Sequence, residues 1–257
     1  MYTKNNLKQH LAEMGIQPAD TLLVHSSVKK IGETEGRADG ILDALMEYLR
    51  EGLLVFPMLS YAEIKTGNPR FSVRNTPSCV GILSELFRQR PGVFRSLHPT
   101  HSVAAFGRDA ETFIAGHETF NTPCARESPW GRIVQRNGKI LFIGTGIGCN
   151  TLLHGVEEWF GVPGMLSVEE QPLEVVTADG RVIPVPSRRH EGNRSRNYAK
   201  LEPLFLQHGV MRIVSFGNAK CHLADSRLMA NFVTRLLEQD PSLFGHERVP
   251  VLNGPCP

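Results

Sequence analysis

Hydrophobic positions along the chain switch repeatedly between two periods. Short apolar runs of strand length occur at residues 21–24, 52–57, 139–144 and 210–217, and segment 95–107 begins as a loop and ends as a further strand. Between these runs, apolar residues recur every three or four positions, which is typical of amphipathic helices. This spacing predicts helices at residues 4–14, 37–50, 80–90, 110–117, 152–160, 195–208 and 223–238, with another starting at 128–131.

Strands that alternate with helices favour an α/β fold. We therefore expect a single domain over residues 1–257, with a central mixed or mainly parallel sheet covered by helices. Segment 172–186 alternates in polarity and contains Asp179 and Gly180, a frequent hairpin turn, so we expect an antiparallel hairpin as an addition to that sheet. The polar segment 60–78, interrupted by glycine and proline, is expected to be a long surface loop of the kind that carries binding residues.

Composition narrows the class of protein. Of the 257 residues, 41% are hydrophobic and 21% are charged, as in ordinary globular proteins. No run approaches the roughly 18 consecutive apolar residues of a membrane helix, and the polar N-terminus is unlike a secretion signal. We expect a cytoplasmic protein with no membrane association. The five cysteines are odd in number and form no C-x-x-C pair, which argues against a disulfide framework and a thiolate zinc site.

The net charge is +2, and the basic residues do not form one long tract. Nucleic-acid binding is therefore not expected. Two small basic clusters occur, Lys29–Lys30 and Arg188–His190. Either cluster could contact a phosphate, and either could equally be solvated surface charge.

The richest group of reactive side chains follows the strand at 139–144. A glycine-rich turn leads into a helix that begins at Asn150 or Thr151 and places His154 in its first turn. Thr151 and Glu157 lie three residues to either side of His154, so all three share one helix face. A carboxylate beside an imidazole can orient the ring and stabilise its cation, as a general base requires. The alternative is a capped helix with a histidine that packs there. The turn lacks the G-x-G-x-x-G spacing of a dinucleotide site.

Two other groups of residues have candidate chemistry. Segment His25–Gly32 follows the first strand, and its hydroxyls, backbone N–H groups and two lysines, Lys29 and Lys30, could hold a phosphate or an amide-bearing arm, although a plain connecting loop would look the same. Several histidines could ligate a metal together with Cys124, but their spacing is irregular and no H-E-x-x-H is present. We expect no metal, and a metal-dependent hydrolase remains an alternative. The histidines in question are His98, His101, His117, His154 and His190.

Six motifs in order along the chain resemble the aminoglycoside 3-N-acetyltransferase family, which is distinct from the GNAT acetyltransferases. The resemblance covers nearly the whole chain, and residues 198–241 are also similar to the C-terminal segment of that family. The motifs are VHSSVKKIG (24–32), NTPS with Gly81 (75–81), RSLHPTHS (95–102), SPW (128–130), ILFIG (140–144) and NTLLHGVE (150–157).

This resemblance implies an enzyme that uses acetyl-CoA as a cosubstrate to acetylate a small-molecule amine, with His154 as the base that deprotonates the acceptor. Attack on the thioester creates an oxyanion, for which the backbone N–H groups of His25–Val28 and the Ser26 and Ser27 hydroxyls are candidate donors. The resemblance also implies pantetheine contacts from Ser26, Ser27, Val28, Lys29, Arg95 and Ser102.

The acid partner of His154 is left open. The family has an acid some thirty-odd residues beyond the histidine, and the corresponding position in this chain falls near Glu191, out of register by a residue or two. Glu191, Glu157 or His190 could therefore hold that place. A family member that binds CoA or a phosphorylated ligand without turnover is a second alternative, and a homodimer is left open.

The acceptor is a further question. Aminoglycosides are polycations, for which an acidic cleft is expected. The net charge of +2 and the arginines after segment 172–186 favour a different acceptor, such as an amino sugar on a nucleotide carrier or another metabolite amine.

Overall fold

A seven-stranded mixed sheet forms the centre of the molecule. The computed structural model describes residues 1–251, and the strand order is β4-β5-β2-β1-β6-β10-β9. These strands are β1 (Thr21–Ser26), β2 (Leu53–Leu59), β4 (Phe94–Arg95), β5 (His101–Gly107), β6 (Lys139–Ile143), β9 (Met211–Phe216) and β10 (Ala219–Asp225). In this sheet β1 is parallel to both of its neighbours, β2 and β6. Every other pair of neighbouring strands in it is antiparallel. The predicted mixed α/β fold is confirmed, whereas the mainly parallel version is wrong.

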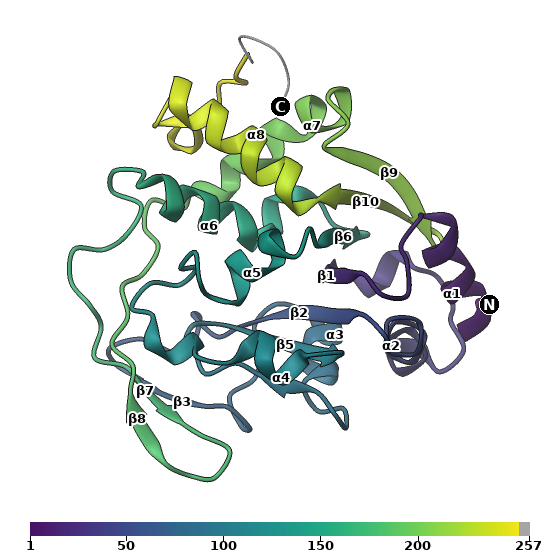
Figure 1. Ribbon diagram of the computed structural model, residues 1–257, viewed down its shortest axis with the longest axis horizontal. Coiled ribbons are helices and arrows are strands. Elements are labelled where there is room, and N and C mark those ends of the chain that lie inside the picture. The colour runs from purple at the N-terminus through teal and green to yellow at the C-terminus, as the bar shows by residue number, and fades with distance from the viewer. Residues whose placement is uncertain (252–257) are drawn as a thin grey trace.

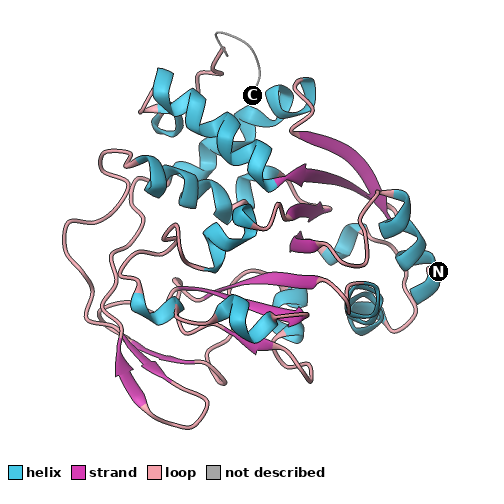
Figure 2. Cartoon of the chain, viewed as in Figure 1, coloured by secondary structure: helices cyan, strands magenta, loops and turns pink. Residues whose placement is uncertain are grey.

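Helices cover both faces of this sheet (Figures 1 and 2). Successive residues of each central strand point to opposite faces, so Leu23 packs into one hydrophobic core while Leu22 and Val24 pack into the other. The first core includes residues of α4 (Ala110–Ile114), α5 (Pro129–Gln135), α6 (Thr151–Phe160), α7 (Glu202–Gln207) and α8 (Ser226–Gln239). The second includes residues of α1 (Lys4–Glu13), α2 (Arg37–Tyr48) and α3 (Ile82–Phe87).

The C-terminal part of the sheet differs from the sequence prediction. Residues 219–225 form strand β10 between β6 and β9, whereas the apolar pattern predicted that a closing helix begins at Leu223. The helix α8 instead begins at Ser226. The Asp225 side chain accepts hydrogen bonds from the backbone N–H groups of Arg227 and Leu228 at 2.9 and 2.8 Å, which caps the helix start. The ladder bonds on both sides of β10 therefore override the helical spacing.

The predicted hairpin exists, but it is not part of the central sheet. Strands β7 (Glu174–Val176) and β8 (Val182–Pro184) pair antiparallel around the Asp179 turn. They form a separate small sheet with β3 (Arg70–Ser72), which pairs in parallel with β7. This sheet has its own apolar cluster around Phe71 and Val175. Segment 60–78 was predicted to be a loop and in fact supplies β3, because its short apolar stretch gains a partner only from a distant part of the chain.

The predicted helix at 195–208 is divided into two. A 3₁₀ helix spans Arg194–Leu201, and α7 follows from Glu202. Pro203 stands at the start of α7 and has no N–H to donate to the preceding turn, which explains the change of helix type at this point.

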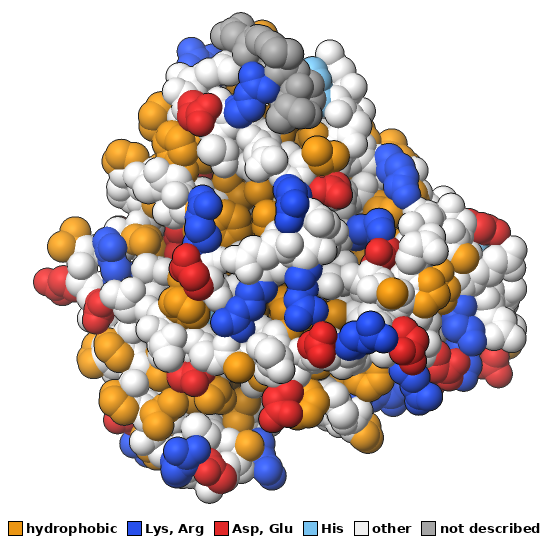
Figure 3. Space-filling view, viewed as in Figure 1, with side chains coloured by type: hydrophobic (Ala, Val, Ile, Leu, Met, Phe, Trp, Pro, Cys, Tyr) orange, Lys and Arg blue, Asp and Glu red, His pale blue; other side chains and the backbone are white. Residues whose placement is uncertain are grey.

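Charged side chains of both signs are interspersed on the face of the molecule drawn in Figure 3. None of the helices within residues 1–251 combines the length and apolar character needed to cross a bilayer.

Candidate active site at the ends of the central strands

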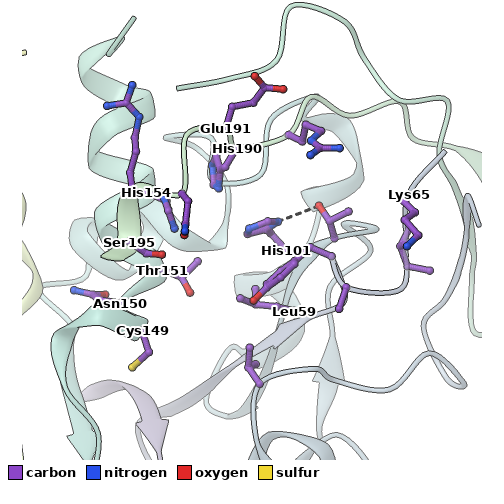
Figure 4. A pocket seen from close by; sticks show the side chains of 18 of the residues that line it. Leu59, Lys65, His101, Cys149, Asn150, Thr151, His154, His190, Glu191 and Ser195 are labelled. Atoms are coloured by element: carbon purple, nitrogen blue, oxygen red, sulfur yellow. Dashed lines mark hydrogen bonds between the residues drawn. The ribbon is translucent and has the colours of Figure 1, made fainter. Parts of the chain in front are cut away.

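A cavity of about 470 Å³ lies where the β2 and β6 strands end. The carboxyl ends of parallel strands are the usual ligand-binding edge of an α/β sheet. The wall is formed by the segment after β2, the start of β5, the turn and helix after β6, and the segment that precedes α7 (Figure 4). Its polar residues include Lys65, Thr100, His101, Asn150, Thr151, His154, Gln171, Arg189, His190, Glu191, Arg194 and Ser195.

His154 reaches this cavity because of how α6 begins. The glycine-rich turn after β6 ends at Asn150, whose side-chain oxygen accepts a hydrogen bond from the Leu152 N–H at 3.1 Å. This cap starts the helix at Thr151, so His154 lies in the first turn, as the sequence predicted. Its side chain is 19% exposed, which leaves the ring both held by the protein and open to a substrate.

Tyr198 connects His154 to Glu157. The Tyr198 hydroxyl lies 2.6 Å from His154 Nδ1 and donates to Glu157 Oε2 at 2.5 Å, whereas Nδ1 and Oε2 are themselves 3.7 Å apart. Because the hydroxyl proton goes to Glu157, we assign the other proton to Nδ1, which leaves Nε2 as the basic nitrogen. Burial and the nearby Glu157 raise the pKa of Tyr198 well above its usual value, so the phenol stays protonated.

Arg194 balances the charge of Glu157. The Glu157 side chain is completely buried, and its second oxygen lies 3.6 Å from an Arg194 terminal nitrogen. Arg194 also donates to the Pro163 carbonyl at 3.0 Å, which fixes its position. A buried carboxylate is tolerated when a cation and hydrogen bonds compensate for the lost hydration. Arg194 and the Tyr198 hydroxyl therefore compensate the buried Glu157 carboxyl group, which lies where it can stabilise a cation on His154.

His190 and Glu158 form a second histidine–carboxyl pair beside the first. The His190 ring stacks on the His154 ring with centroids 4.6 Å apart. Its Nε2 lies 2.5 Å from Glu158 Oε1, which also accepts the Cys124 N–H at 2.8 Å. Burial raises the pKa of Glu158 to about 8 and, aided by His154, lowers the pKa of His190 well below its usual value. Burial thus favours the uncharged forms of both groups, a protonated carboxyl that donates to a neutral imidazole.

The histidines considered as metal ligands form a buried row of rings instead. His101 meets His190 edge-on at 4.9 Å, and His98 lies between His101 and His117. Burial lowers the pKa of all four, that of His98 to about 3, so these rings are neutral. Several of their nitrogens bond to neighbouring groups, as when His117 Nδ1 meets the Ser96 hydroxyl at 2.8 Å.

Within residues 1–251, one set of three side chains has the spacing of metal ligands, namely Cys124, Glu158 and His190. Its donors are poorly suited to a metal. Burial raises the pKa of Cys124 well above that of a free thiol, and Glu158 is also held protonated. Zinc is bound by the thiolate and carboxylate forms. The chemistry of this set therefore does not favour the metal-dependent hydrolase.

The structure distinguishes the three candidate partners of His154. Glu157 is connected to it through Tyr198, and His190 stacks on it. Glu191 is exposed, and Figure 4 shows its carboxylate extending away from His154. Within residues 1–251 no hydrogen bond or ion pair joins Glu191 to His154, so the geometry favours Glu157 as the carboxylate that acts on the base.

The loop proposed to hold pantetheine lies beside the cavity. Ser26, Ser27 and Val28 are partly buried and Lys29 is exposed. A Cβ on Gly81 would lie 3.5 Å from the Ser26 carbonyl, so this loop packs against the segment that contributes Val80 to the cavity wall. His25 faces inward instead. Its ring stacks on Phe142 at 5.1 Å, and burial lowers its pKa to about 3.

Arg95 and Ser102 lie inside the protein and are not part of the cavity wall. Arg95 donates to Ser102 Oγ at 3.1 Å, to the Thr76 carbonyl at 2.5 Å and to the Met58 carbonyl at 3.1 Å. Ser102 also donates to the Met58 carbonyl at 2.8 Å. These bonds satisfy both side chains and connect β4, β5 and the end of β2. The geometry therefore favours a structural role for Arg95 and Ser102 over contact with pantetheine.

Two important residues, Tyr198 and Arg194, were not singled out from the sequence. Tyr198 stands 44 positions beyond His154 and reaches it only because the 3₁₀ helix packs beside α6. No local spacing rule connects residues so far apart. The one available indication was the resemblance of the segment that begins at Tyr198 to the C-terminal part of the family.

The chain is similar to known protein sequences over most of its length. The family model described as aminoglycoside 3-N-acetyltransferase matches residues 23–238. The chain is 27% identical to aminoglycoside N(3)-acetyltransferase III of Salmonella sp, with 97% of each chain covered. It is 28% identical to the aminoglycoside N(3′)-acetyltransferase-like protein YokD of Bacillus subtilis, with 86% of this chain and 87% of that protein covered.

The fold of the chain is also similar to those of solved aminoglycoside acetyltransferases. The chain matches the apoenzyme of aminoglycoside acetyltransferase AAC(3)-IVa with a TM-score of 0.82 and 27% identity, over 95% of this chain and 91% of that one. AAC-IIIb in its binary complex with CoASH matches with a TM-score of 0.82 at 24% identity, over 93% and 97% of the two chains, which shows the shared fold.

Proposed function

The chain belongs to the aminoglycoside 3-N-acetyltransferase family, and we propose that it transfers an acetyl group from acetyl-CoA to an amino group of an aminoglycoside, amino sugar or related amine. The family assignment confirms the predicted acyltransferase class. It does not favour the two alternatives, a binding protein without turnover and a metal-dependent hydrolase. A relative, AAC(3)-IVa, has been solved in complex with a gentamicin and with apramycin, so aminoglycosides are the first acceptors to test.

The observation that carries this proposal is the connection from His154 through Tyr198 to Glu157. An alkyl amine is protonated at neutral pH and attacks only as the free amine, after its ammonium form has released one proton to water. His154 Nε2 is available for the second proton, which the nitrogen must lose as it becomes an amide, because Nδ1 is bonded to Tyr198. The imidazolium that forms is stabilised by the Glu157 carboxylate through the Tyr198 hydroxyl. His154 therefore accepts the proton as the nitrogen–carbon bond forms at the thioester carbonyl.

The second half of the reaction returns this proton. When the tetrahedral intermediate collapses, the carbon–sulfur bond breaks and the thiolate of CoA leaves. His154 donates its proton to that sulfur, which restores the neutral imidazole and leaves the N-acetylated product. The same residue acts first as base and then as acid, so no further proton donor is needed.

The oxyanion of the intermediate requires hydrogen-bond donors in the loop after β1. The Ser27 N–H is already donated to the Ile143 carbonyl at 2.8 Å. Other donors in the predicted set include the Val28 N–H and the Ser26 and Ser27 hydroxyls. Val28 begins a 3₁₀ helix, where an N–H has no partner within the helix. We assign the oxyanion contact to these groups.

The test is release of free thiol from acetyl-CoA in the presence of a panel of amines, for the wild type and for His154→Ala. The substitution removes the base, and we expect turnover to fall by about 10²- to 10⁴-fold. The KM for acetyl-CoA should change little, because Nε2 faces the acceptor. Turnover that persists in His154→Ala would make this residue structural and would exclude the mechanism.

A further inference from the structure

The charged residues in the cavity wall are mostly basic. Lys65, Arg189 and Arg194 line it, and Glu191 is the only carboxylate among the lining residues that the structure describes. Arg194 is already paired with Glu157. Lys65 and Arg189 are both exposed, and neither forms an ion pair within residues 1–251. Two cations are therefore free to meet a ligand.

Lys65 and Arg189 come from separate segments that are tied together at one side of the cavity. The Gln171 side chain donates to Thr66 Oγ1 at 3.2 Å, beside Lys65. The Gln171 backbone exchanges hydrogen bonds with Ser187, two residues before Arg189. These bonds link the two segments, and both cations belong to the wall of the same cavity.

The acidic residues near the cavity do not offset these cations. Glu191 is directed away from His154 (Figure 4). Glu157 is bonded to Tyr198 and Arg194, and Glu158 to His190 and the Cys124 N–H. An acceptor with several ammonium groups would thus meet two free cations and a single carboxylate, that of Glu191, which opposes its binding.

We propose that the preferred acceptor is a monoamine that also carries an anionic group, a phosphate or a carboxylate, which Lys65 and Arg189 bind while the amine faces His154. This inference rests on the proposed acetyltransferase function and names its acceptor class. An amino sugar phosphate or a nucleotide-linked amino sugar has this chemistry. Arginine provides paired donors for a phosphate, and lysine adds a point charge.

Acetyl-CoA also carries phosphates, but the expected entry of its thioester is across the cavity. A Cβ on Gly144 would lie 3.0 Å from the Ser27 carbonyl, so the predicted pantetheine loop packs against the turn that leads to Cys149. Figure 4 shows Cys149 and Lys65 on opposite sides of the cavity. Lys65 therefore lies on the side left for the acceptor, and Gln171 links its segment to the one that carries Arg189.

The experiment compares kcat/KM for acceptors matched in everything except charge. Glucosamine, its 1-phosphate and 6-phosphate, and a nucleoside diphosphate-linked amino sugar form one series, and kanamycin represents the polycations. We expect at least one anionic acceptor to exceed glucosamine by tenfold or more and to exceed kanamycin. The preference should shrink as ionic strength rises, because salt screens contacts at exposed cations.

Variants assign the preference to the two residues. Lys65→Gln and Arg189→Gln should each reduce the ratio of kcat/KM between the anionic acceptor and glucosamine by about three- to tenfold, through the acceptor KM. Arg108→Gln is the matched control. Arg108 is an exposed cation near Glu51 outside the cavity wall, and its substitution should leave the ratio unchanged.

Three results would overturn the inference. Higher kcat/KM for kanamycin than for every anionic acceptor would exclude the acceptor class while the acetyltransferase function stands. A rise in the acetyl-CoA KM alone in Lys65→Gln and Arg189→Gln would assign these cations to the phosphates of CoA. Absence of thiol release with every acceptor would reject the proposed function itself, and the acceptor inference with it.

Discussion

Glu157 and Glu158 are neighbours on α6 and both are buried, yet their surroundings give them opposite chemistry. Glu157 has a guanidinium at 3.6 Å and a phenol at 2.5 Å, so its charge is compensated. Glu158 is bonded to His190 and the Cys124 N–H, and burial raises its pKa to about 8. Burial alone therefore does not determine the charge of a carboxyl group. The nearest cation and the hydrogen-bond donors around the group decide it.

This difference predicts separate roles for the two histidine–carboxyl pairs. Glu157, which contacts Arg194 and Tyr198, is expected to support a cation on His154 during proton transfer. The neutral Glu158 holds the His190 ring against His154 and positions it. Substitutions in the first pair should act on the chemical step, and those in the second should act on stability and its pH dependence.

Among substitutions of the residues around His154, the largest effect should come from Glu157→Gln. This variant removes the charge that stabilises the His154 cation and leaves Arg194 without its partner, so we expect kcat to fall by about 10²- to 10³-fold. The KM for acetyl-CoA should stay within a few-fold of the wild type. Single-turnover kinetics measure the effect, and thermal unfolding shows whether the variant is folded. A kcat close to that of the wild type would remove Glu157 from the mechanism.

Tyr198→Phe should have the next largest effect. It keeps the ring packed but removes the hydroxyl that joins His154 Nδ1 to Glu157 Oε2, which are 3.7 Å apart. We expect kcat to fall by about 10- to 100-fold, because the carboxylate then acts only through space. The combined Tyr198→Phe and Glu157→Gln variant should lose little more than Glu157→Gln alone, since both break one connection. Additive losses would show that the two residues act independently.

Glu158→Gln should change catalysis by less than tenfold and instead alter how stability depends on pH. Native Glu158 keeps its proton up to a pKa of about 8, whereas the unfolded chain loses it near the ordinary value of 4.5. Wild-type stability therefore falls as pH rises through this window, and a glutamine does not contribute to that fall. The variant should gain up to ~1.4 kcal/mol per pH unit relative to the wild type, measured by denaturant unfolding across the window. Parallel pH profiles for both proteins would mean that Glu158 is ionised in the native state.

The buried neutral histidines should make stability depend on pH in the opposite direction from Glu158. His98 has a native pKa lowered by burial from 6.5 to about 3. Below pH 6.5 the unfolded chain binds a proton there and the native protein does not, so stability is lost as pH falls through that range. His98→Asn retains an oxygen that can accept the His101 N–H, now bonded to Nδ1 at 3.0 Å. It should remove up to ~1.4 kcal/mol per pH unit of this acid-side slope, as urea unfolding below pH 6.5 would show. An unchanged slope would mean that His98 is protonated in the native state.

Much of the fold followed from local patterns. The period of the apolar residues identified most helices and the central strands β1, β2 and β6, because each of these elements faces a core over its whole length. The pattern failed at β3 and β10. Both strands owe their conformation to hydrogen bonds with segments far away in sequence, and such pairing leaves little local trace.

By itself, the sequence determined the family, the α/β class and the position of His154, because the glycine-rich turn, the Asn150 cap and the helix register are all set by neighbouring residues. Only the tertiary structure decided which groups contact His154, what surrounds the two adjacent carboxyl groups of α6, and why Arg95 is satisfied inside the protein. Those outcomes depend on distances of 2.5–3.7 Å between segments far apart in the chain. Ionisation responds to that three-dimensional environment, which no spacing along the sequence records.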